Sequence, residues 1–95
     1  MRLRYTATAR TEIADILTTI ASENLEAAER VASAIKSAAA RLLRFPLIGR
    51  RTDMTDVRVK LARPYHHLIF YSVERETVVI RNVRHPAQRR PKADR

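Results

Sequence analysis

The stretch NLEAAERVASAIKSAAARLLRFP, residues 24–46, decides the fold of this chain. Its apolar residues recur at a spacing of three and four, which is the spacing of one face of a helix. Asn24 is a favourable N-cap, and Pro46 ends the helix because proline has no N–H to donate. We therefore predict a long amphipathic helix with the buried stripe Ala28, Val31, Ala32, Ile35, Ala38, Ala39, Leu42 and Phe45.

A shorter helix and a strand precede this long helix. Alternating basic and apolar residues over residues 2–6 predict the strand. Thr8 is the expected N-cap of the shorter helix. The many alanines in the long helix allow a close approach, so we expect the two helices to form a hairpin. The apolar face of the shorter helix consists of Ile13, Ile16, Leu17 and Ile20.

Beyond Pro46 the period of the apolar residues changes from 3.6 to 2, which indicates strands. Residues 57–61 predict a strand whose outer face carries Arg58 and Lys60. Residues 66–73 are apolar on both faces, as is typical of a central strand. Residues 77–84 predict the strand that follows it after a turn.

The predicted element order is β-α-α-β-β-β, an α+β fold in which a helical hairpin packs on one face of a small antiparallel sheet. We expect residues 1–85 to form a single domain and residues 86–95 to form a basic C-terminal tail. Gly49 is the only glycine, and we expect it at a backbone conformation that other residues would adopt only with strain.

The charge of the chain is its strongest compositional signal. The net charge is +9 over 95 residues, and the last fifteen residues carry six basic side chains against Asp94 alone. Such a field attracts nucleic acid or an acidic protein surface, although a solubilising tail is the simpler alternative. There is no cysteine, and no apolar run approaches the length of a membrane span. We expect a cytoplasmic protein.

Several kinds of chemistry lack their sequence signals. One glycine does not make a phosphate-binding loop, and no serine lies in a G-x-S-x-G turn. His66 and His67 are adjacent, so on a strand they point to opposite faces and do not share a metal ion. We predict no metal and no cofactor.

A basic set on the predicted sheet remains as a candidate for chemistry. Cations stabilise the charge that develops in phosphodiester cleavage, and a histidine is suited to moving the proton. Solvated surface charges are the plain alternative. The set consists of Arg58, Lys60, Arg63, Arg81, Arg84 and His85.

Three segments resemble the RelE/ParE toxin superfamily. Residues 42–50, LLRFPLIGR, are similar to the end of its long helix and the loop that follows. Residues 67–74, HLIFYSVE, resemble its central strand, and residues 78–85, VVIRNVRH, resemble its last strand with the histidine that often follows. Because the element order agrees as well, the resemblance covers essentially the whole chain.

The resemblance implies the toxin half of a type II toxin–antitoxin pair. RelE-like members cut messenger RNA on the ribosome, whereas ParE-like members inhibit DNA gyrase. The ribonuclease branch typically has an arginine near the start of the central strand and a tyrosine after the last strand. This chain has Tyr65-His66-His67 at the first place and no tyrosine after His85. These absences favour gyrase inhibition over RNA cleavage, and a non-toxic nucleic-acid-binding module is a third reading.

Each reading assigns roles to particular residues. A ribonuclease would use Arg58, Lys60, Arg81 and His85, whereas a gyrase inhibitor needs no catalytic residue. The resemblance also implies a cognate antitoxin with an acidic, partly disordered segment, to which we assign contacts at Arg58, Lys60, Arg63 and Tyr71. The contacts expected with the target, gyrase or alternatively the ribosome and its mRNA, are at Arg81, Arg84, His85, Arg89 and Arg90.

Overall fold

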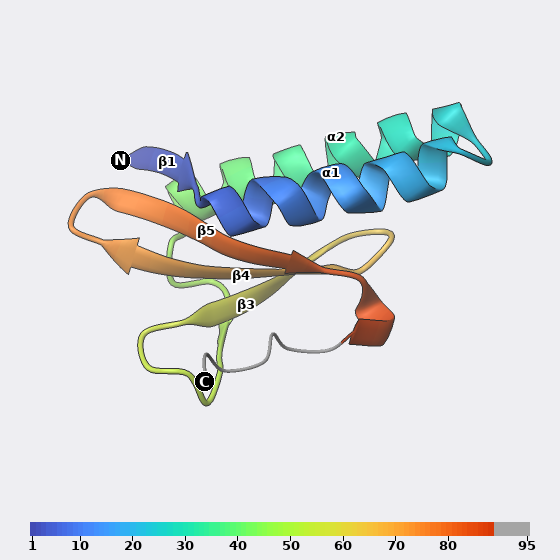
Figure 1. Cartoon of the computed structure of the whole chain (residues 1–95). Helices are drawn as coiled ribbons and strands as arrows, with labels where there is room; N and C mark the ends of the chain where they lie inside the picture. The colour runs from blue at the N-terminus through green and yellow to red at the C-terminus, as the bar shows by residue number, and fades with distance from the viewer. Residues whose placement is uncertain (89–95) are drawn as a thin grey trace.

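The computed structural model describes residues 1–88 and forms two layers, a helical hairpin on one face of a five-stranded sheet (Figure 1). The strand order is β1-β5-β4-β3-β2, which places β4 in the centre. The elements are β1 (Arg2–Tyr5), α1 (Ala7–Ala21), α2 (Leu25–Arg44), β2 (Arg50–Arg51), β3 (Arg58–Ala62), β4 (His67–Glu74), β5 (Thr77–Arg84) and the 3₁₀ turn η1 (Pro86–Gln88).

The predicted α+β fold is confirmed, with one difference in strand pairing and one additional strand. β1 pairs with β5 in parallel, whereas the other neighbours pair antiparallel. The two-residue strand β2, which we expected to belong to a loop, pairs with β3. The central strand begins at His67, because His66 lies in the preceding turn with a positive φ of 65°. The sheet is therefore mixed, although mostly antiparallel.

The long helix buries nearly the predicted stripe. Six of its eight predicted residues are buried, and the Asn24 side chain accepts a hydrogen bond from the Ala27 N–H as the N-cap. Phe45 is the main exception, because it lies past the last helical turn and its side chain is 48% exposed. The guanidinium groups of Arg41 and Arg44 lie 5.9 Å and 5.6 Å from the centre of its ring.

Residues at the start of α1 hold an irregular part of β5. Thr6, not Thr8 as expected, is the N-cap, and its hydroxyl accepts from the Ala9 N–H. The same hydroxyl donates to the carbonyl of Arg81, the extra residue of a β-bulge. Beyond the bulge β1 no longer covers β5, and the Glu12 carboxylate accepts from the Val83 N–H at 2.9 Å instead. The first helix therefore satisfies backbone groups that the sheet leaves open.

The third strand presents its basic residues on the side opposite to the one predicted. Arg58 pairs with Tyr71 and Lys60 pairs with Ile69, and directly paired residues lie on the same face of a sheet. Tyr71 and Ile69 belong to the core under the helices. The basic residues of β3 therefore lie at the margin of the helix-covered face, and apolar Val59 lies on the other face.

Tyr71 connects the loop after α2 to the centre of the sheet. Its side chain is fully buried, and its hydroxyl donates to the Pro46 carbonyl and accepts from the Gly49 N–H, both at 2.8 Å. Burial raises the pKa of Tyr71 above the ordinary tyrosine value, so the hydroxyl keeps the proton that it donates. A Cβ at Gly49 would lie 2.6 Å from the hydroxyl oxygen. Glycine is therefore required for this close approach, and not for a positive φ as we expected.

We predict that Tyr71→Phe lowers the free energy of unfolding by about 1–3 kcal/mol, because it leaves the buried Gly49 N–H and the Pro46 carbonyl without their partner. Thermal unfolding should show a midpoint lower by several degrees. Tyr65→Phe is the matched control, since Tyr65 packs against the core without a hydroxyl hydrogen bond among residues 1–88. Equal midpoints for the two variants would contradict this role of Tyr71.

Candidate functional site

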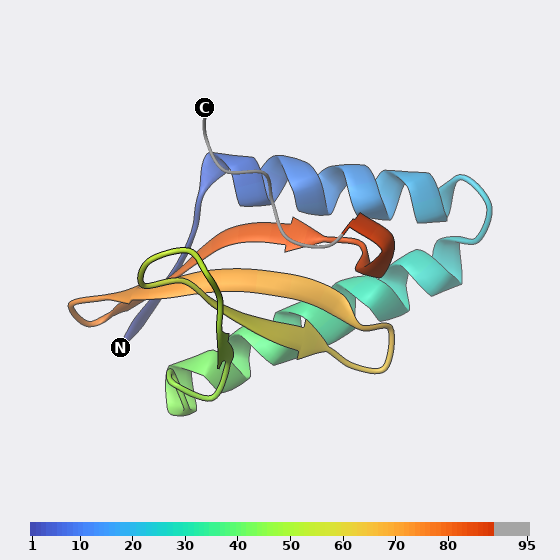
Figure 2. The same cartoon turned by 90° about the horizontal axis from the view of Figure 1, so that it is seen from below.

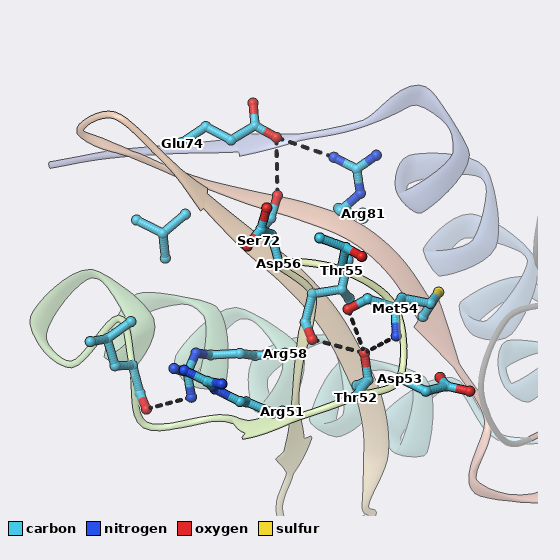
Figure 3. A pocket seen from close by; sticks show the side chains of 13 residues that line it. Arg51, Thr52, Asp53, Met54, Thr55, Asp56, Arg58, Ser72, Glu74 and Arg81 are labelled. Atoms are coloured by element: carbon cyan, nitrogen blue, oxygen red, sulfur yellow. Dashed lines mark hydrogen bonds and ion pairs between the residues drawn. The ribbon is translucent and has the colours of Figure 1, made fainter.

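A cleft of about 780 Å³ is lined in part by Ser72 and Glu74, which alternate with the core residue Tyr71 and so lie on the face of the sheet away from the helices. The loop between β2 and β3 crosses this face and forms one wall (Figure 2). That loop is closed by Thr52, whose hydroxyl donates to the Val57 carbonyl at 2.8 Å and accepts from the Met54 N–H at 3.1 Å. The opposite wall comes from β4 and β5, with Ser72, Glu74 and Arg81 (Figure 3).

The charges in the cleft balance one another. Three arginines and three carboxylates line it, and two of the arginines have partners. Arg81 donates to the Glu74 carboxylate at 3.2 Å, and Ser72 donates to the same oxygen at 3.1 Å. Arg58 donates to the Gly49 carbonyl at 2.9 Å. These contacts position the arginines. The six charged lining residues are Arg51, Asp53, Asp56, Arg58, Glu74 and Arg81.

Two histidines meet at the other end of β4. The rings of His67 and His85 pack edge to face with centroids 5.6 Å apart. His67 is buried, and neither of its ring nitrogens has a hydrogen-bond partner among the described residues. Burial lowers the pKa of His67, and the nearby His85 lowers it further. The buried His67 ring is therefore neutral near pH 7. The His85 ring is held separately, because its Nδ1 accepts a hydrogen bond from the Ala87 N–H at 3.1 Å.

The structure does not bring the four candidate catalytic residues together. Arg58 and Arg81 line the cleft, but Lys60 and His85 do not. His85 contacts His67, which is four residues along β4 from Tyr71, the partner of Arg58. Four residues of a strand span roughly 13 Å. Within the described part of the chain, the histidine is thus remote from the arginines that would bind a phosphate.

The residues expected to contact the target differ in their solvent exposure. Arg81 and His85 are exposed. Arg84 instead forms an ion pair with Glu12 at 2.8 Å, with 23% of its side chain exposed, and so contributes to the attachment of α1. Arg89 and Arg90 lie outside the described residues.

The residues expected to contact the antitoxin do not lie together on one surface either. Arg63 is exposed and lines a second groove of about 560 Å³ between α2 and the turn that follows β3. Arg58 and Lys60 are half-buried. Tyr71 is fully buried and both of its hydroxyl contacts are within the chain, so the structure places it in the core and leaves no surface for a partner.

Sequence reasoning missed two acidic residues that organise this region. Glu74 holds Arg81 and Ser72, and Glu12 holds the edge of β5. The spacing of Ser72 and Glu74 was an available signal, since residues two apart on a strand share a face. Nothing local marks Glu12, because its partners lie about seventy positions later.

Residues 1–88 contain neither a metal-binding cluster nor a membrane-spanning helix. Among them, no three histidine, aspartate or glutamate side chains gather as a metal ion would require. None of the described helices is long and apolar enough to cross a membrane.

Comparison with known proteins identifies the family. The family model for the ParE toxin of the type II toxin–antitoxin system parDE matches residues 3–90. No curated protein matches the chain. Among solved structures, the chain is similar to the chromosomal ParDE toxin–antitoxin system from P. aeruginosa, with a TM-score of 0.73 and 15% identity over 90% of this chain and 95% of that chain. That likeness supports the fold, and the match to the family model extends over nearly all of the sequence. The chain therefore belongs to the ParE toxin family of type II toxin–antitoxin systems.

Proposed function

We propose that this ParE-family toxin acts by binding and inhibiting DNA gyrase, without cleaving RNA. The observation that carries the proposal is the separation of the candidate catalytic residues. Arg58 and Arg81 line one cleft with their guanidinium groups bonded inside the protein, and His85 lies roughly 13 Å along the sheet. General acid–base catalysis needs the proton-transfer group within hydrogen-bond reach of the reacting atoms. Inhibition by binding has no such requirement.

The proposed contacts with gyrase centre on the exposed Arg81 and His85 and continue into the tail with Arg89 and Arg90. Arg84 supports them by fixing the end of β5 to α1 through Glu12. Exposed basic residues at the rim of an interface mainly raise the association rate and fix the orientation of the partners.

Neutralisation by a cognate ParD-type antitoxin belongs to the same proposal. A partly disordered segment suits the groove beside Arg63, because a groove accepts a segment that folds on binding. Its acidic residues would pair with Arg30 and Arg63, since Glu26 and Glu29 also line this groove. Arg58 and Lys60 lie on β3, five and three positions before Arg63, and add positive charge at the margin of the helix-covered face. The proposed antitoxin contacts are thus Arg58, Lys60 and Arg63.

Ribosome-dependent mRNA cleavage is the second candidate, because Arg58 and Arg81 do share a cleft. It predicts cleavage of ribosome-bound mRNA by the purified toxin, reduced about 100-fold or more by His85→Ala. Our proposal predicts no cleavage by the unmodified protein. Toxin-dependent cleavage that His85→Ala removes would replace gyrase inhibition with this reading.

We expect the purified toxin to inhibit supercoiling of relaxed plasmid by DNA gyrase, and the cognate antitoxin to restore supercoiling. A protein of net charge +9 also coats DNA at low salt, so the assay is run at physiological salt. Relaxation of the same plasmid by a type I topoisomerase is the control, and it should be unaffected. Equal inhibition of both enzymes would indicate DNA coating, and undisturbed supercoiling would contradict the proposal.

We predict that removing residues 86–95 raises the toxin concentration for half-inhibition of gyrase by about tenfold, because exposed charge pairs contribute up to about 1 kcal/mol each. Arg89→Ala combined with Arg90→Ala tests the charges alone. Circular dichroism checks that both variants are folded. A folded variant with full inhibition would remove the tail from the target contacts.

For the antitoxin, we predict that Arg63→Glu weakens its binding about tenfold or more, since an acidic residue then faces an acidic segment. Arg75→Glu is the matched control, because Arg75 is exposed in the turn between β4 and β5 and lines neither groove. Calorimetric titration with the antitoxin measures both. Equal affinity for the two variants would place the antitoxin elsewhere.

A further inference from the structure

The turn that follows α2 exposes an unusual run of apolar residues. Phe45, Leu47 and Ile48 are 48%, 65% and 40% exposed, and Pro46 lies among them. Single exposed apolar residues are common, but several exposed apolar residues close together on a protein surface generally mark an interaction site. We name residues 45–48 the anchor turn. Figure 2 shows it at one corner of the molecule, where α2 ends.

Hydrogen bonds to its backbone hold the anchor turn rigidly. The Ile48 N–H donates to the Phe45 carbonyl at 3.1 Å, which closes the turn. The Pro46 carbonyl accepts from the buried Tyr71 hydroxyl, and the Leu47 carbonyl accepts from Arg58 at 3.3 Å. These bonds fix the backbone while the apolar side chains remain in solvent. A partner would therefore bind the turn with little loss of conformational entropy.

Basic residues flank the anchor turn on both sides along the chain. Arg41 and Arg44 pack against the Phe45 ring, and Arg50 is exposed just beyond Gly49. Aromatic residues and arginine are enriched at protein–protein interfaces relative to the rest of the protein surface. Residues 30–52 contain no acidic side chain, so the side of the anchor turn next to α2 favours a partner that carries carboxylates. Their basic residues are Arg30, Lys36, Arg41, Arg44, Arg50 and Arg51.

We propose that the anchor turn inserts into a concave apolar pocket, rimmed by carboxylates, on the folded protein that the toxin inhibits. This inference rests on the proposed function and adds a contact surface to it. A protruding, rigid turn fits a preformed pocket, whereas a disordered antitoxin segment fits a groove such as the one beside Arg63. Leu47 also lines the cleft that contains Arg81. The anchor turn and Arg81, one of the proposed target contacts, thus border the same cleft.

The test compares two identical changes at equally exposed leucines. Leu47→Ser removes the most exposed side chain of the anchor turn, and Leu25→Ser changes a residue that is also 65% exposed but lies at the opposite end of α2. We expect Leu47→Ser to require about 30-fold more toxin for half-inhibition of gyrase and to relieve growth arrest on induction. Leu25→Ser should match the unmodified toxin. Both variants should have the same thermal unfolding midpoint and the same affinity for the antitoxin as the unmodified toxin.

Three results would overturn the inference. Full inhibition and full growth arrest by folded Leu47→Ser would show that the anchor turn does not contact the target. Loss of antitoxin affinity by the same factor would make the turn an antitoxin surface. A toxin that neither arrests growth nor inhibits gyrase would have no target contact at all.

Failure of the gyrase proposal is distinguishable from these results. If the unmodified toxin arrests growth without inhibiting gyrase, the target is a different one. The comparison of growth arrest by Leu47→Ser and Leu25→Ser then decides the role of the anchor turn by itself.

Discussion

The buried hydroxyl of Tyr71 is the interaction on which the functional surface depends. It joins the centre of the sheet to the loop after α2, and Gly49 leaves the space for it. Arg58 adds two hydrogen bonds to carbonyls of the same loop. An apolar turn without these bonds would pay a large entropic cost on binding and would be free to collapse onto the protein. The core of the fold therefore fixes the geometry of its most exposed apolar surface.

Sequence periodicity was sufficient for most of the fold. The stripe of α2, the change of period after Pro46 and the bounds of β5 all follow from how apolar residues must face a core. It failed where the reason was tertiary. Phe45 continues the helical spacing but lies beyond the last turn, where its ring packs against two arginines. The requirement for Gly49 comes from Tyr71, which lies twenty-two positions later.

The candidate site was less predictable, because alternation assigns residues to two faces without saying which one the helices cover. Arg58 and Lys60 were expected on an open basic face of the sheet. Their pairing with core residues places them on the face that the helices cover. The bulge at Arg81 also shifts the register of β5 against β4. The residues that hydrogen-bond to β5 at and just after the bulge, Thr6 and Glu12, are far away in sequence. A basic composition therefore indicated a macromolecular partner, but not how its charges are distributed.

We propose that this ParE-family toxin stops DNA replication through gyrase and leaves translation intact at first. Pulse-labelling after induction in a bacterial host, with DNA and protein synthesis followed separately, tests it most directly. We expect DNA synthesis to fall first and the cells to become filamentous. A collapse of protein synthesis before any change in DNA synthesis would contradict it.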